Sequence, residues 1–230
     1  MIRLADDLSV EKSQSVSISA DLYRNWGEWQ GNFLVEGFFT DLDDVFALKE
    51  IGFEDGILIK ERHNESGARV FGGNLEGKIA YRNIFQLQLG LTAQNSKYKE
   101  ARSWSDDVEA TRNMFRTPDF HGYITASYNP VKKLTLALSG TYTGSMLIEH
   151  HVGMIDRNMT VKTSPFWDMG FKAAYDFRIY NSFNLQLNAG IQNIFNSFQK
   201  DFDSGADRDS GYMYGPTLPR CFYLGIKLNY

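Results

Sequence analysis

The chain has 230 residues, of which 14% are aromatic, and it contains 20 glycines but only 5 prolines, a composition that favours strands and turns over helices or disorder. The net charge of -4 and the scattered Lys and Arg residues exclude a basic surface for nucleic acid. Cys221 is the single cysteine, which excludes an intrachain disulfide framework and a multi-cysteine metal site. No segment approaches the roughly 20 apolar residues of a membrane-spanning helix.

Alternation of two unlike faces runs through most of the chain and predicts strands. In residues 134–148 the even positions are apolar or glycine, whereas the odd positions from Thr135 to Ser145 are small or hydroxylic. In residues 167–179 every charge lies on one face. The pattern predicts about nine strands, which are residues 16–22, 33–39, 71–81, 85–93, 120–128, 134–148, 167–179, 184–195 and 218–230.

The segments between these strands alternate in length. Short polar turns are expected at residues 24–30, 82–84, 129–133 and 180–182, and long loops at 41–57, 99–113, 149–164 and 196–217. Short turns on one side and long loops on the other are typical of outer-membrane barrels, and strands of about ten residues can cross the apolar band. The sequence therefore predicts an all-β fold, an antiparallel up-and-down transmembrane β-barrel.

The predicted strand number indicates part of a larger barrel. About nine strands would leave two open edges, which lipid does not tolerate. The first residues have no apolar signal-peptide core and reach Asp6 and Asp7 at once. We expect residues 1–14 to be an N-terminal segment with a truncated start, and residues 15–230 to form a single partial domain of C-terminal barrel strands.

Four segments of the second half carry a family resemblance. They are Tyr128-Asn129-Pro130 with Lys132, Lys133 and Leu134-Thr135-Leu136; Gly140-Thr141-Tyr142-Thr143-Gly144; Gly190-Ile191-Gln192-Asn193-Ile194-Phe195-Asn196; and Pro219-Arg220 with the strand Phe222 to Tyr230. These segments resemble the C-terminal barrel strands of TonB-dependent outer-membrane receptors, and the run from Asn193 to Asn196 is the most specific.

The resemblance implies a receptor and transporter in the bacterial outer membrane that takes up a scarce nutrient, such as a ferric siderophore or a cobalamin-like ligand. It also implies that the partners are membrane lipid, a plug domain with the N-terminal strands of a barrel of about 22 strands, the TonB system and the barrel-assembly machinery. In this family the terminal strand is the assembly signal, and the matching residues are Phe222, Ile226, Leu228 and Tyr230.

Two other functions stay open at this point. One is a small plug-free pore or structural barrel of about eight to ten strands, for which an even strand number is required. The other is a soluble β protein that binds a ligand, in which a second sheet covers the apolar faces. In a barrel, the lumen-facing residues would include Glu76, Lys78, Lys172, Asp176, Arg178 and Lys227.

Candidate sites for chemistry are few. Asp201, Asp203, Asp207 and Asp209 are the residues that could bind calcium in an extracellular loop, but the spacing is not that of an EF-hand, Arg208 would compete for the carboxylates, and a solvated acidic loop is the preferred interpretation. His150 and His151 should point to opposite faces and lie in an exposed loop. No nucleophile elbow, P-loop or zinc signature is present, so no enzyme activity and no cofactor are expected.

Overall fold

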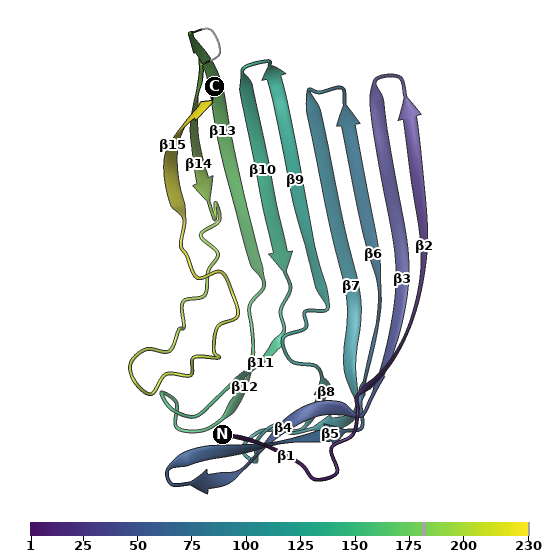
Figure 1. The fold of residues 1–230 in the computed structure, drawn as a ribbon, viewed down its shortest axis with the longest axis vertical. Helices are drawn as coiled ribbons and strands as arrows, with labels where there is room; N and C mark the ends of the chain where they lie inside the picture. Colours follow the sequence, from purple (N-terminus) through teal and green to yellow (C-terminus); the bar gives the residue numbers. More distant parts are fainter. Residues whose placement is uncertain (181–182, 230) are drawn as a thin grey trace.

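A computed structural model describes residues 1–180 and 183–229 and shows one large, curved antiparallel sheet (Figure 1). The sheet has ten strands in the order β15-β14-β13-β10-β9-β7-β6-β3-β2, with β8 paired to β7 outside this path. The strands are β2 (Lys12–Trp26), β3 (Trp29–Asp43), β6 (Ala68–Tyr81), β7 (Phe85–Arg102), β8 (Thr111–Asn113), β9 (Phe120–Val131), β10 (Leu134–Thr143), β13 (Phe166–Tyr180), β14 (Phe183–Gln192) and β15 (Cys221–Asn229). Each of the nine strands on the path corresponds to one predicted strand, so the all-β fold is confirmed.

The register gives the sheet one polar and one apolar face. Asp168 of β13 lies opposite Thr141 of β10, and Thr141 lies opposite Tyr123 of β9. Paired residues share a face and neighbours along a strand alternate. The same polar face therefore continues from strand to strand, although Leu34 and Phe38 of β3 also lie on it.

The connections are sorted by side as predicted. Short turns join β2 to β3, β6 to β7 and β9 to β10 at one end of the sheet, and the longer connections gather at the other end (Figure 1). The short turn predicted at residues 180–182 includes Asn181 and Ser182, which lie outside the described residues.

The long connections contain more regular structure than expected. The segment 41–57 was predicted as a loop, but it contributes β4 (Val45–Glu54), which forms a hairpin with β5 (Ile57–Glu65). β1 (Ile2–Leu4) pairs with β5 in parallel, so the first residues join this small sheet, and β2 begins at Lys12. β11 (Leu147–His150) and β12 (Met159–Lys162) pair within the next long connection. The predicted strand 134–148 is therefore two strands, β10 and β11.

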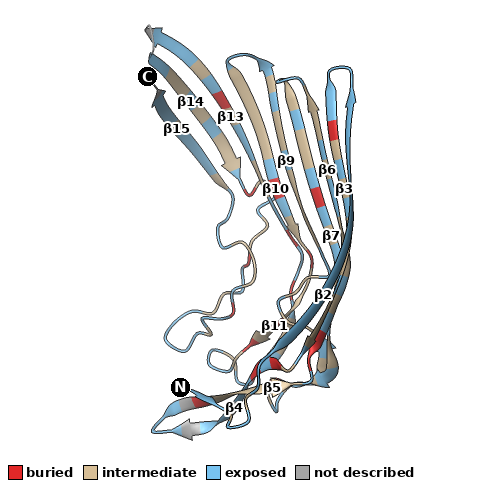
Figure 2. Cartoon of the chain, turned by 45° about the vertical axis from the view of Figure 1, so that its right-hand side comes forward, coloured by how far each residue is buried: buried red, intermediate tan, exposed pale blue. Residues whose placement is uncertain are grey.

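Burial is concentrated among the long connections, whereas the apolar face of the sheet is open (Figure 2). Phe222 and Leu224 of β15 are 78% and 79% exposed, and aliphatic and aromatic side chains of β2, β3 and β13 are also exposed. The largest fully buried side chains, Ile148 and Gln199, belong to the long connections. In the described residues no helix has the length and apolar character needed to cross a membrane.

Candidate functional site

The charged residues expected to face a lumen lie on one face of the sheet. Glu76 and Lys78 belong to β6 and lie opposite Gly90 and Gln88 of β7, on the face that Tyr123 shares. At the other side of the sheet, Lys172, Asp176 and Arg178 lie at alternate positions of β13, and Lys227 of β15 lies opposite Gln186 of β14. Asp176 accepts a hydrogen bond from Gln186 at 2.9 Å.

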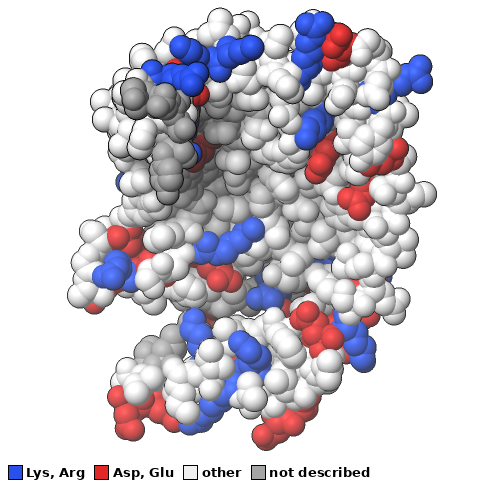
Figure 3. Space-filling view, turned by 45° about the horizontal axis from the view of Figure 1, so that its top comes forward, with Lys and Arg blue, Asp and Glu red and all other residues white. Residues whose placement is uncertain are grey.

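Charged groups gather mainly around a hollow of the molecule and over the long connections (Figure 3). Lys172, Asp176, Arg178 and Lys227 lie on β13 and β15, which are separated only by β14. Glu76 and Lys78 lie on β6, several strands away from β13. The six predicted residues therefore share a face without forming one compact cluster.

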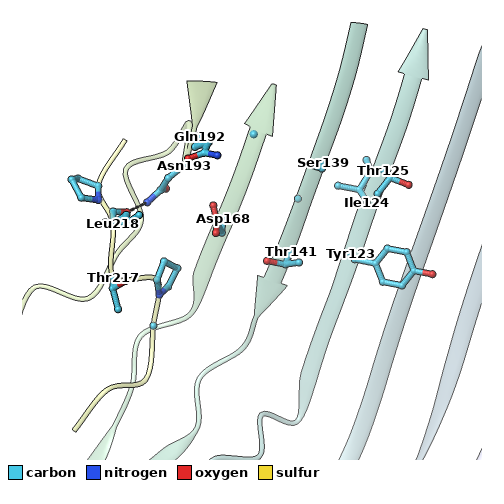
Figure 4. Close-up of a pocket in the computed structure, with 15 residues that line it drawn as sticks. Tyr123, Ile124, Thr125, Ser139, Thr141, Asp168, Gln192, Asn193, Thr217 and Leu218 are labelled. Atoms are coloured by element: carbon cyan, nitrogen blue, oxygen red, sulfur yellow. Dashed lines mark hydrogen bonds between the residues drawn. The ribbon is translucent and has the colours of Figure 1, made fainter. Parts of the chain in front are cut away.

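A cavity of about 670 Å³ lies between this polar face and the connection from β14 to β15 (Figure 4). Thr125, Ser139 and Thr141 supply hydroxyl groups from β9 and β10, and Asp168 supplies a carboxylate from β13. Tyr123 also lines the cavity, but its hydroxyl points away from residues 217–218 and accepts a hydrogen bond from Gln88 of β7 (Figure 4). Residues 215–219 form the opposite wall. These polar groups lie among apolar surface from Ile124, Leu218 and the two prolines of the opposite wall, so the lining suits a solute that has both hydrogen-bonding groups and apolar surface.

The loop over this cavity is fixed at its base by the Asn193–Asn196 run. Asn193 and Asn196 have φ values of 48° and 54°, a left-handed conformation that asparagine tolerates better than most residues. Asn193 is 4% exposed, and its amide contacts both Ser197 and Leu218. Asn196 Oδ1 accepts the backbone N–H of Arg220 at 3.0 Å. The motif that carried the family resemblance therefore joins the two ends of the loop.

A second polar cluster holds the same loop to β11. His150 is 7% exposed, its Nε2 lies 3.0 Å from Oδ2 of Asp203, and its ring stacks on Tyr212 with centroids 3.6 Å apart. Asp203 also accepts the backbone N–H of Asp209, whose own carboxylate accepts the N–H of His151. The prediction that both histidines lie in an exposed loop was wrong for His150, because the loop folds over β11 and covers it.

Two tyrosines converge on Asp201 in this loop. The hydroxyl groups of Tyr212 and Tyr214 donate to its carboxylate at 2.8 and 2.7 Å. Burial and the neighbouring Asp201 carboxylate raise the pKa of Tyr212 to about 12 and raise the pKa of Tyr214 further. Burial raises the pKa of the Asp201 carboxyl, but hydrogen bonds from the two hydroxyl groups, from a backbone N–H and from Gln199 together outweigh burial and hold this pKa below its usual range.

The four loop aspartates do not converge on a common point. Asp201, Asp203 and Asp209 accept hydrogen bonds from different partners, and Asp207 is exposed. Within residues 1–180 and 183–229, no three His, Cys, Asp or Glu side chains are placed to hold a metal ion. Arg208 does not compete for the carboxylates either, since Nη1 donates to the carbonyl oxygen of Gly205.

Sequence reasoning missed the partners that order this loop. Gln199 is 1% exposed, donates to the carbonyl of Tyr212 and accepts the N–H of Tyr214. Nothing in the local sequence marks Gln199 or Tyr212 as buried, because Gln199 and its partners Tyr212 and Tyr214 lie 13 to 15 residues apart. His150 and Asp203 are 53 residues apart.

The residues matched to an assembly signal occupy β15. Phe222, Ile226 and Leu228 alternate along the strand on the exposed apolar face. Tyr230, the fourth residue of that set, lies outside the described residues. β15 is also an edge strand of the sheet, since it pairs with β14 alone in the part of the chain that the structure describes.

Comparison with known proteins gives structural matches only. No family model and no curated protein matches the sequence. The ferric-catecholate import receptor Fiu from E. coli K12 matches with a TM-score of 0.67 and 20% identity, over 98% of this chain and 29% of that chain. The iron transporter FrpB from Neisseria meningitidis (F5-1 variant) matches with a TM-score of 0.60 and 16% identity, over 98% and 33%.

The siderophore receptor PirA from Acinetobacter baumannii also matches, with a TM-score of 0.60 and 14% identity, over 95% of this chain and 32% of that chain. The chain thus spans about a third of the length of the solved structures it matches. The three neighbours are named as an import receptor, an iron transporter and a siderophore receptor. The resemblance seen in the sequence is confirmed in the fold, which is that of part of the β-barrel of TonB-dependent siderophore and metal receptors.

Proposed function

We propose that the chain is the C-terminal barrel part of an outer-membrane receptor that takes up a scarce nutrient, such as a ferric siderophore or a cobalamin-like ligand. The observation that carries this proposal is a curved sheet whose two faces differ in polarity along nine successive strands, with exposed apolar side chains on strands from β2 at one edge to β15 at the other. An exposed apolar face of this size is stable against lipid and unstable in water.

The edges of the sheet support a larger barrel. β2 and β15 are the two ends of the strand path, and neither has a second neighbour among the described residues. Unpaired strand edges are not tolerated in lipid, so strands from the rest of the receptor would close the barrel. The two alternatives are weaker, because a plug-free pore needs a closed barrel and a soluble protein needs a second layer over the apolar face.

The polar face and the long connections supply the receptor part of the proposal. Under this proposal Glu76, Lys78, Lys172, Asp176, Arg178 and Lys227 face the lumen, where a plug domain would sit, and the long connections face outward toward the ligand. Phe222, Ile226, Leu228 and Tyr230 would be read by the barrel-assembly machinery, and the TonB system would energise uptake.

The first test is to read the residues encoded upstream of Met1, where we expect a plug domain and an energy-coupling segment. The full-length protein should then shift its mobility on heating in detergent and should accumulate labelled ferric siderophore or cobalamin only when the inner membrane is energised. Uptake that persists after collapse of the proton gradient would instead identify a passive pore. A protein that is extracted without detergent would contradict both membrane functions.

A further inference from the structure

A separate cavity of about 330 Å³ lies between the β4–β5 hairpin and the ends of β7 and β11. The strands β4, β5 and β11, which contribute to its lining, lie on the side of the long connections (Figure 1). Three successive connections contribute to its lining, through Arg62 of β5, Arg102 of β7 and Glu149 of β11. It shares no lining residue with the cavity under residues 215–219.

Two arginines line this cavity, and they differ in whether a carboxylate binds the guanidinium group. Nη1 of Arg102 donates to Glu65 at 2.8 Å, and its guanidinium lies 4.6 Å from the centre of the Tyr98 ring, so it is held in place. Arg62 is half-buried and has no carboxylate partner in the part of the chain that the structure describes. Because a partly buried charge without a partner is costly, Arg62 favours an anion in the cavity.

The one carboxylate among the lining residues is committed elsewhere. Glu149 lies 3.8 Å from Nε2 of His151. The contact with His151 lowers the pKa of the Glu149 carboxyl, and the charge of Arg102 lowers it further. Burial raises this pKa, but the net shift is downward. Glu149 therefore stays ionised beside His151, and the lining cations contributed by β5 are Lys60 and Arg62.

Aromatic rings form the other walls. Trp104 is 8% exposed, its Nε1 donates to Thr160 at 3.1 Å, and its ring meets His151 edge-on with centroids 4.7 Å apart. These contacts hold the indole of Trp104 in place. The guanidinium of Arg102, which lies over the Tyr98 ring, holds that ring in the same way. Rigid aromatic walls beside a guanidinium suit a flat ligand, since rings stack on aromatic surfaces and guanidinium groups pair with carboxylates through two hydrogen bonds.

We propose that this cavity binds a small planar aromatic carboxylate, with Arg62 paired to the carboxylate and the ring against Trp104 and Tyr98. A volume of about 330 Å³ accommodates one substituted ring and is at the small end of ligand cavities, which range over about 300–1,000 Å³. The proposal deepens the proposed function and rests on it for the outward orientation of this side.

The test is calorimetric titration of the detergent-solubilised full-length protein with benzoate, benzamide, cyclohexanecarboxylate and inorganic phosphate. Benzoate should bind, and its dissociation constant should rise about tenfold or more in Arg62→Gln, since one charge-assisted pair is lost. Arg62→Lys should restore part of the affinity. Trp104→Leu should weaken benzoate binding, whereas Lys132→Gln in the distant turn and Trp167→Leu on the apolar face should not.

Three results would overturn the proposal. They are equal binding of benzamide, equal binding of phosphate or cyclohexanecarboxylate, and unchanged benzoate affinity in a folded Arg62→Gln protein. Energised nutrient uptake is measured separately on the same proteins. Uptake without benzoate binding would overturn the site alone, and benzoate binding without energised uptake would overturn the transporter alone.

Discussion

Nδ2 of Asn193 donates a hydrogen bond to the carbonyl oxygen of Leu218 at 2.9 Å and so joins the two ends of the connection between β14 and β15. Oδ1 of the same amide accepts the backbone N–H of Ser197 at 2.8 Å. One buried side chain thus satisfies backbone groups at both ends of the loop that covers the larger cavity. The loop is positioned by its base as well as by its contacts with β11.

Replacing Asn193 with glycine should loosen this loop while leaving the strands intact. Glycine accepts the φ of 48° without strain, so the change removes the side-chain hydrogen bonds alone. A buried backbone group left without a partner costs about 1–3 kcal/mol. We expect faster proteolysis within residues 196–217 and unchanged heat-modifiable mobility. Ser210→Ala, at an exposed position of the same loop, is the matched control, and equal cleavage of both variants would contradict the role of Asn193.

The contact between His150 and Asp203 should make the loop sensitive to acid. Burial raises the pKa of the Asp203 carboxyl, but the N–H of Asp209 and the ring of His150 outweigh it, and the net shift is downward. A lowered pKa in the folded state means stabilisation that is present above the unfolded value of about 3.9 and lost as pH falls through the folded value.

The measurement for this contact is protease accessibility of residues 196–217 as a function of pH, with an acid-stable protease. Protection should be complete near neutral pH and should fall below about pH 4. Asp203→Asn should weaken protection at neutral pH and flatten the response, and Asp207→Asn, at an exposed position, should change neither. An unchanged acid response in Asp203→Asn would assign the effect to other carboxylates.

Tyr212 and Tyr214 should ionise later than the other tyrosines. Their pKa values are raised by burial and by the Asp201 carboxylate, to about 12 for Tyr212. A raised folded pKa contributes stability that is present below the unfolded value of about 10 and is lost as pH rises through the folded value. In an absorbance titration, the double variant Tyr212→Phe/Tyr214→Phe should lose only the latest phase. If the double variant instead loses part of the absorbance change near pH 10, the phase at the highest pH does not belong to Tyr212 and Tyr214.

The strands of the large sheet could be predicted because their pattern is local. Alternation follows directly from the strand geometry, and lipid on one side with polar surroundings on the other makes it strong. The residues at which the strands end were harder to predict. Alternation continues from Leu134 through Ile148, yet β10 ends at Thr143 and β11 begins separately at Leu147, although Gly144 still donates its N–H to the carbonyl oxygen of Phe120.

The loop sites could not be predicted in the same way. The β4–β5 hairpin lies where a loop was expected, although β4 and the start of β5 are rich in apolar residues, and the pairing of β1 with β5 joins segments over 50 residues apart. His150 meets Asp203, and Arg62 meets the cavity beside Trp104, only after the connections fold over each other. Such contacts between distant loop residues leave no periodic signal, whereas Asn193 and Asn196 were found through family resemblance before their geometry explained them.

The two faces of β15 provide the sharpest test of membrane insertion. Ile226 and Lys227 are neighbours on this strand, but Ile226 lies on the apolar face, 69% exposed, and Lys227 on the polar face opposite Gln186. An arginine that faces lipid near the middle of a membrane costs about 2–4 kcal/mol, whereas a lumen-facing change costs little. Ile226→Arg should therefore reduce the amount of heat-modifiable protein in the outer membrane, and Lys227→Gln should leave it near the wild-type amount. If both variants assemble equally well, the apolar face does not meet lipid, and a sheet covered by a second protein layer becomes the better description.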